Sequence, residues 1–263
     1  MYDFKGKDVL VAGGAGLIGT HLVKMLIEEE EARVTIADLR HEERAHPRAD
    51  FRRVDLLQSE ACEWVCAEMD YAFNLLCVKG SPRFVRHNPA DMLEKNLLLD
   101  INLLRAARKM DVEGYLLASS LAVYPPADMF LEDAVWDGMP SRNDWWAGWA
   151  KRMGELQAEA YSIQYGWDRI SIVRPTNTYG PFDDFWSDAA MVVPSLIRSA
   201  VEGENPIQIA GDGLQERDFL HARIEGVGNS IKGPEKSDNQ RQNSSGSRKL
   251  GFILRTEKQS CNV

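Results

Sequence analysis

The stretch VLVAGGAGLIGT, residues 9–20, decides the fold of this 263-residue chain. Its apolar beginning predicts a buried strand, and the glycines that follow predict a tight turn into a helix. In such a turn Gly13 permits the change of direction, Gly16 lets a ligand approach the backbone, and Gly19 lets the helix pack closely on the strand. The free N–H groups that open the helix favour a phosphate. The spacing therefore predicts a strand–turn–helix unit that binds a dinucleotide.

An acidic residue defines the expected dinucleotide further. Asp38 follows a second expected strand, residues 33–37, and lies 19 positions after Gly19. A carboxylate there hydrogen-bonds ribose hydroxyls and repels a 2′-phosphate, which favours NAD over NADP. Arg40, two residues later, weakens that preference. Asp55 follows a third short strand and is placed either to meet the adenine amino group or to lie in water as a loop carboxylate.

Apolar segments recur at regular intervals along the first 175 residues. Strands are expected at residues 8–12, 33–37, 51–54, 71–76, 114–118 and 169–173, and helices at 17–30, 59–68, 89–110 and 145–165. This alternation is typical of a Rossmann-type, doubly wound parallel sheet with helices on both faces. The helical period in residues 89–110 predicts a buried face made of Met92, Leu93, Leu97, Ile101 and Leu104.

Composition excludes several classes of protein. The formal net charge of −9 makes a nucleic-acid backbone an unsuitable partner. The four cysteines form no disulfide or zinc pattern, so we expect a reducing, cytoplasmic environment and no metal. No apolar run reaches the ~18 residues of a membrane span, so no membrane contact is expected.

The composition changes after His221. Residues 229–249 are rich in Ser, Asn, Gln, Lys and Gly and contain one large aliphatic residue, Ile231. Such a segment buries too little apolar surface to offset its ordering entropy. We therefore expect a dinucleotide-binding domain over residues 1–175, a short, partial substrate lobe over 176–228 and a disordered polar tail over 229–263.

Two serines follow the strand at 114–118. Ser119 and Ser120 stand where open α/β sheets bind ligands, just beyond a strand's carboxyl end. A serine there either hydrogen-bonds a sugar hydroxyl or keto oxygen, or caps a turn; the sequence leaves both open.

Several motifs taken together resemble one family. They are G-x-x-G-x-x-G at 13–19, Asp38, the serines at 119–120, Trp149-Ala150-Lys151, RPTNTYGP at 174–181 and GDGLQERDF at 211–219. Residues 6–221 are thereby similar to the extended short-chain dehydrogenase/reductases, in their NAD-dependent nucleotide-sugar epimerase/dehydratase branch. The resemblance implies a Rossmann fold with a C-terminal substrate lobe, which is shortened here. It implies NAD contacts from Gly13, Gly16, Leu17, Ile18, Gly19, Asp38, Asp55, Leu56, Leu75 and Lys151.

The resemblance also implies catalytic roles. In that family a serine, a tyrosine and a lysine act together, and the lysine's positive charge lowers the pKa of the tyrosine so that it can take a proton from the sugar. Ser120 and Lys151 match the serine and the lysine, but Ala147 stands where the tyrosine belongs. Tyr124 and Tyr179 do not have the helical spacing to Lys151. A natural variant that binds without efficient turnover and an introduced Tyr-to-Ala change both explain this alanine.

The remaining matches concern the substrate. Asn177 and Arg217 match positions that hold a nucleotide diphosphate or sugar, although Arg217 could instead form a surface ion pair. Leu121-Ala122 replaces the Asp-Glu of sugar dehydratases, which disfavours dehydration. Similarity extends to GDP-fucose synthase and to GDP-mannose 3,5-epimerase. We expect an impaired epimerase that uses a transient keto-sugar; the alternatives are a catalytically silent binding protein and a 4-keto-sugar epimerase-reductase. Helices 89–110 and 145–165 are expected to form a homodimer.

Overall fold

The computed structural model describes residues 3–187, 189–209, 216–223 and 251–252. Its main sheet is parallel, with the strand order β3-β2-β1-β4-β5-β6-β9. The strands are β1 (Asp8–Ala12), β2 (Arg33–Asp38), β3 (Asp50–Arg53), β4 (Tyr71–Asn74), β5 (Gly114–Ala118), β6 (Ile170–Val173) and β9 (Gly251–Phe252). This is the order of a Rossmann sheet, so the predicted fold is confirmed.

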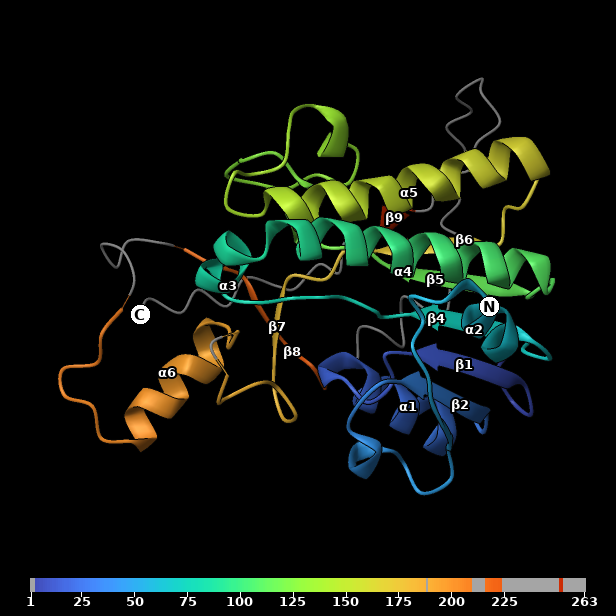
Figure 1. Ribbon diagram of the computed structural model, residues 1–263, viewed down its shortest axis with the longest axis horizontal. Coiled ribbons are helices and arrows are strands. Elements are labelled where there is room, and N and C mark those ends of the chain that lie inside the picture. Colours follow the sequence, from blue (N-terminus) through green and yellow to red (C-terminus); the bar gives the residue numbers. More distant parts are fainter. Residues whose placement is uncertain (1–2, 188, 210–215, 224–250, 253–263) are drawn as a thin grey trace, which may run out of the picture.

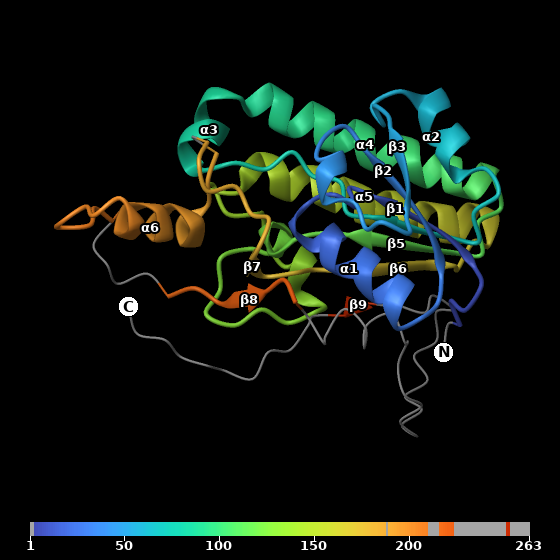
Figure 2. The ribbon, with the colours of Figure 1, turned by 90° about the horizontal axis from the view of Figure 1, so that it is seen from below.

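Helices cover both faces of this sheet (Figures 1 and 2). On one face lies α1 (Leu17–Glu28); on the other lie α2 (Ser59–Cys66), α4 (Pro89–Lys109) and α5 (Trp145–Tyr165). Strand β1 shows why both faces of the sheet need a covering layer. Because successive side chains point to opposite faces, Val9 and Val11 join the core beneath α1, while Leu10 and Ala12 join the core beneath α2 and α4.

Several elements are additions to the predicted set. They are α3 (Pro82–His87), α6 (Val192–Val201), β7 (Asn177–Tyr179) and β8 (Phe219–His221), besides short 3-10 helices such as η1 (Glu42–Arg44) and η2 (Leu121–Val123). Strands β7 and β8 pair in parallel as a separate two-stranded sheet. Figure 1 shows this small sheet beyond the arrowheads of β1, β4 and β5, on the side where α3 also lies.

The predicted buried face of α4 is partly wrong. Ile101 is 38 % exposed, whereas the polar residues Asn96 and Asp100 are buried. Both have hydrogen-bond partners, such as the backbone of Val78 for Asn96, and these bonds offset the cost of removing the polar groups from water. A search for apolar residues alone therefore misplaces the helix face.

Most of the expected tail lies outside the described residues. Gly251 and Phe252 form β9, which pairs with Ile172 and Val173 of β6. Within the described part of the chain, no helix is long and apolar enough to cross a membrane.

Candidate functional site

The candidate site lies at the carboxyl edge of the sheet. Parallel strands end together there, and β1 and β4 are neighbours although they are far apart in sequence, so the strand order reverses between them. Open α/β sheets bind ligands in the crevice at this reversal. The glycine turn after β1 and the segment after β4 face each other across it, because the turn at Gly13 lies against the backbone of Leu75.

The glycine turn is tightly built on one side and open on the other. Gly13 has a φ of +80°, a backbone conformation that residues with a side chain rarely adopt. A Cβ on Gly19 would lie 2.2 Å from the Gly13 carbonyl oxygen, so helix α1 can pack here only on a glycine. At Gly16 the same test meets one atom at 3.2 Å, again the Gly13 oxygen. Gly16 is also the N-cap of α1 and has no side chain to bond the first N–H groups, which remain available to a phosphate.

Acidic residues at the ends of β2 and β3 continue the site. The Asp38 carboxylate accepts hydrogen bonds from the backbone N–H groups of Ala15 and Arg40, both at 3.2 Å. It therefore lies directly against the glycine turn. Asp55 is half-buried and accepts a bond from the Leu57 N–H at 3.0 Å. The neighbouring Leu56 is 2 % exposed and belongs to the core beneath α2 and α4.

These residues fit an adenine dinucleotide. The open backbone at Gly16 and the N-terminus of α1, which Leu17 and Ile18 begin, suit the pyrophosphate. Asp38 at the end of β2 suits the adenosine ribose. The Leu75 backbone adds the wall on the β4 side.

Replacing Asp38 tests this assignment. Asp38→Ala removes the carboxylate that would accept hydrogen bonds from the ribose hydroxyls, and with it the partner of the Ala15 N–H. Hydrogen bonds to charged groups contribute about 1.5–3 kcal/mol, so NAD binding should weaken about 10- to 100-fold, while discrimination against NADP relaxes. Calorimetric titration with both cofactors measures this. Unchanged affinities for both would remove Asp38 from the site.

Ser120 lies at the end of β5 and caps the short helix that follows. Its Oγ accepts a hydrogen bond from the Ala122 N–H at 3.1 Å. A hydroxyl that accepts one bond still has its proton to donate, so the cap does not prevent contact with a ligand oxygen. The next residue, Leu121, donates to the Pro175 carbonyl at 3.2 Å. That bond brings the serine turn beside the segment that leads into Asn177.

Lys151 is buried at 2 % exposure, and its ammonium is already paired. Its Nζ lies 3.2 Å from each carboxylate oxygen of Asp100 and 3.1 Å from the Leu76 carbonyl oxygen. The Asn74 amide donates to the same carboxylate at 2.9 Å. Burial raises the pKa of Asp100, and Lys151 opposes that shift. Sequence reasoning missed Asp100, because it is an acidic residue inside an apolar helix pattern.

The position at which the resemblance expects a tyrosine carries no titratable group. Ala147 lies one helical turn before Lys151 on α5 and is half-buried. Tyr124 does not replace the tyrosine, because it is 3 % exposed and its hydroxyl accepts a bond from Arg174 at 2.9 Å. Burial raises the pKa of Tyr124, so its hydroxyl stays protonated near neutral pH and cannot accept a proton from a substrate.

A second buried charge network supports the end of β6, and sequence reasoning missed it. Arg174 donates two bonds to Glu155, at 2.9 and 2.8 Å, in the planar fork that suits a carboxylate. Ser119 donates to the same carboxylate. The network joins β5, β6 and α5 beneath the site. Ser119 is buried in it and has a supporting role, whereas Ser120 is partly exposed and can reach a ligand.

The two residues matched to substrate binding lie side by side. Asn177 on β7 donates through Nδ2 to the Asp218 carbonyl oxygen at 3.0 Å. Arg217 is exposed, and its guanidinium donates to the Glu216 carbonyl oxygen at 2.8 Å. It also acts electrostatically on Asp144, the N-cap of α5. Arg217 therefore carries a positive charge to the helix end where Ala147 lies.

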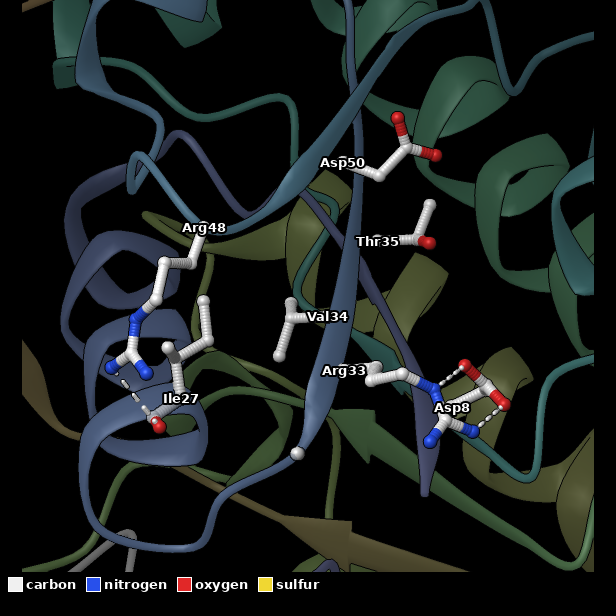
Figure 3. A pocket seen from close by; sticks show the side chains of 8 residues that line it. Asp8, Ile27, Arg33, Val34, Thr35, Arg48 and Asp50 are labelled. Carbon is white, nitrogen blue, oxygen red and sulfur yellow. Dashed lines mark hydrogen bonds and ion pairs between the residues drawn. The ribbon is translucent and has the colours of Figure 1, made fainter. Parts of the chain in front are cut away.

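A hollow of about 410 Å³ lies at the opposite edge of the sheet (Figure 3). Its two guanidinium groups are already engaged. Arg33 forms a two-point ion pair with Asp8, and Arg48 donates to the Ile27 carbonyl oxygen at 3.3 Å. The hollow lies at the amino ends of β1, β2 and β3, away from the crevice, and we do not assign the site to it.

Comparison with known proteins gives the family. Residues 9–223 match the family described as NAD dependent epimerase/dehydratase, which names the expected cofactor. GDP-L-fucose synthase of Sinorhizobium fredii is 32 % identical over 84 % of this chain and 69 % of its own. A UDP-N-acetylglucosamine 4-epimerase from Methanobrevibacter ruminantium, solved with UDP-N-acetylmuramic acid, is 27 % identical over 86 % of this chain and 72 % of its own, with a TM-score of 0.73. UDP-glucose 4-epimerase of Thermus thermophilus, solved with NAD, is 26 % identical over 86 % and 73 %, with a TM-score of 0.69. The chain belongs to the NAD-dependent epimerase/dehydratase family.

Proposed function

We propose that this protein binds NAD and a nucleotide diphosphate sugar, and that it is an epimerase acting through a transient keto-sugar with impaired proton transfer. One observation carries the proposal. Ala147 stands one helical turn before Lys151, in a site that keeps the glycine turn, Asp38 and Ser120. The ammonium of Lys151 is paired with Asp100, and position 147 offers no phenol whose pKa that ammonium could lower.

The side chains divide the work of binding and chemistry. Bound NAD supplies an acceptor and donor of hydride. Ser120 donates a hydrogen bond to the reacting sugar oxygen, and Arg217 offers its planar guanidinium to the diphosphate. Asn177 holds the backbone beside Arg217 in place. The methyl group of Ala147 can take no proton from the sugar hydroxyl, so that step proceeds to water without a positioned base and is slow.

The second candidate is a keto-sugar epimerase-reductase. The relative from Sinorhizobium fredii favours it, because GDP-L-fucose synthase belongs to that class of reaction. By its resemblance to GDP-fucose synthase, this chain has Ala122 and Met191 where that enzyme has a cysteine and a histidine, which favours the plain epimerase. A catalytically silent binding protein is the limiting case of the same proposal.

NMR of sugar products separates these candidates. The purified protein is incubated with UDP- and GDP-sugars and NAD, and separately with 4-keto-sugar nucleotides and reduced cofactor. Slow formation of an epimer with NAD supports the epimerase. Product formation only with reduced cofactor supports the reductase, and spectra that match a protein-free blank in both arms leave the silent binding protein.

We also propose a homodimer through the outer faces of α4 and α5. These helices pack side by side, and their outer surfaces expose Leu98, Ile101, Leu156 and Ile163 by 38 to 71 %. Light scattering after size-exclusion chromatography should give twice the mass of the chain. A monomer mass at micromolar concentration would contradict the dimer.

A further inference from the structure

The turn at residues 180–183 reaches from β7 back to the dinucleotide-binding part of the chain. Its residue Phe182 is held there by Arg44 of η1, which follows β2. The Arg44 guanidinium donates to the Phe182 carbonyl oxygen at 2.9 Å and lies 5.8 Å from the centre of the Phe182 ring. The two residues are 138 positions apart in sequence, so the contact joins separate parts of the fold.

Two further elements hold the same turn. Lys79, from the segment after β4, lies 3.0 Å from a carboxylate oxygen of Asp183, whose side chain is 2 % exposed. His21 of α1 lies 6.2 Å from the Phe182 ring and 6.5 Å from His221 at the end of β8. In Figure 1 the end of β8 meets the beginning of α1, which agrees with these ring contacts.

The elements that hold the turn are the elements that bound the cofactor crevice. The glycine turn leads into α1, the β2 end carries Asp38, and the segment after β4 begins with Leu75. The 180–183 turn therefore spans the crevice from the adenosine side to the β4 side. Phe182 keeps a φ of +72° in doing so, a left-handed conformation that is unfavourable for a bulky residue and is found where surrounding contacts impose it.

Unpartnered polar atoms gather beside this turn. In the described part of the chain, five buried side-chain nitrogen or oxygen atoms have no hydrogen-bond partner. Two of them lie at the turn, namely Asp183 Oδ2 within it and His21 Nε2 on the ring that contacts Phe182. Folded proteins rarely leave such atoms unpaired. Their concentration here indicates a polar ligand beneath the turn.

We propose that the 180–183 turn is the outer wall of the dinucleotide site, and that Arg44 and Lys79 fasten it over bound NAD. Release of NAD then requires at least one fastening to break. The proposal concerns cofactor binding and does not depend on which sugar reaction the protein catalyses.

The rate at which bound cofactor leaves tests the fastenings. NADH is bound to the protein and displaced by excess NAD in a stopped-flow instrument, with tryptophan-sensitised NADH fluorescence as the signal. Arg44→Ala and Lys79→Ala should each raise the dissociation rate about five- to tenfold, with larger effects in the double variant. Arg53→Ala is the matched control, because the Arg53 side chain is 60 % exposed and, among the residues that the structure describes, bonds to Leu39 and Glu42 and not to the 180–183 turn. Its rate should stay within about twofold of the wild type.

Thermal unfolding without cofactor separates a fastening from a general loss of structure. We expect Arg44→Ala to unfold at the temperature of the Arg53→Ala control and to differ from it only in NADH release. Lys79→Ala leaves the buried Asp183 carboxylate without its cation, so it should also unfold at a lower temperature. Phe182→Ala provides a third variant, should one of the others fail to fold, and should also release NADH faster. Wild-type dissociation rates in all folded variants, or an equal increase in the Arg53→Ala control, would overturn the proposal.

Discussion

The Ala147→Tyr variant is expected to turn over a nucleotide sugar about 10²- to 10⁴-fold faster than the wild type, the usual contribution of a positioned general base. Positions 147 and 151 lie one helical turn apart on α5 and so share a face. A phenol there would lie close to the Lys151 ammonium. That positive charge lowers the pKa of a tyrosine and so raises the fraction of phenolate, the form that accepts a proton, near neutral pH.

NMR of epimer formation measures the gain, and Ala147→Phe is the matched control. Phenylalanine adds the ring without the hydroxyl, so it should leave the rate at the wild-type level. NAD affinity is measured on the same samples. If Ala147→Tyr binds NAD normally yet yields no product from a panel of nucleotide sugars, the missing tyrosine is not what limits this chain. Contacts to the substrate elsewhere in the site then become the better explanation.

The Asp100→Asn variant is expected to lose about 3–5 kcal/mol in the free energy of unfolding, because removing one partner leaves a buried charge uncompensated. Lys151 and Asp100 have side chains that are 3 and 2 % exposed, so water cannot replace the lost partner. Urea unfolding measures the loss. Adding Lys151→Met to Asp100→Asn removes the unpaired charge and should recover part of it.

Helix α4 offers a matched control. Lys95 pairs with Asp91 at 3.0 Å on the exposed side of the helix, with side chains that are 41 and 52 % exposed. Lys95→Ala should cost less than about 1 kcal/mol, as exposed ion pairs do. Equal losses for Asp100→Asn and Lys95→Ala would show that the buried pair has no special part in stability.

Local patterns predicted the dinucleotide-binding part of the fold well. The run of apolar residues before Gly13 and the glycine spacing after it depend on near neighbours only, and β1 begins and ends at the predicted residues, Asp8 and Ala12. Strand β4 ends two residues earlier than predicted. Asn74 there turns its side chain to the Leu76 N–H, and the chain leaves the sheet.

The buried charges were beyond such patterns. Asp100 and Lys151 are 51 positions apart, and a sequence shows neither that both are buried nor that they meet. Glu155 and Arg174 pose the same problem across 19 positions. The pairing of β7 with β8 joins Asn177 to a strand 42 residues later, and three-residue strands carry too little pattern to be recognised.

Under the proposed function, this chain keeps its binding sites and lacks the group that moves the proton. Calorimetric titration of the wild-type protein, first with NAD and then with nucleotide diphosphate sugars on the NAD-saturated protein, tests it most directly. We expect saturable binding of NAD, followed by saturable binding of at least one nucleotide sugar but not of the corresponding free sugar. Absence of saturable NAD binding by folded protein would contradict it.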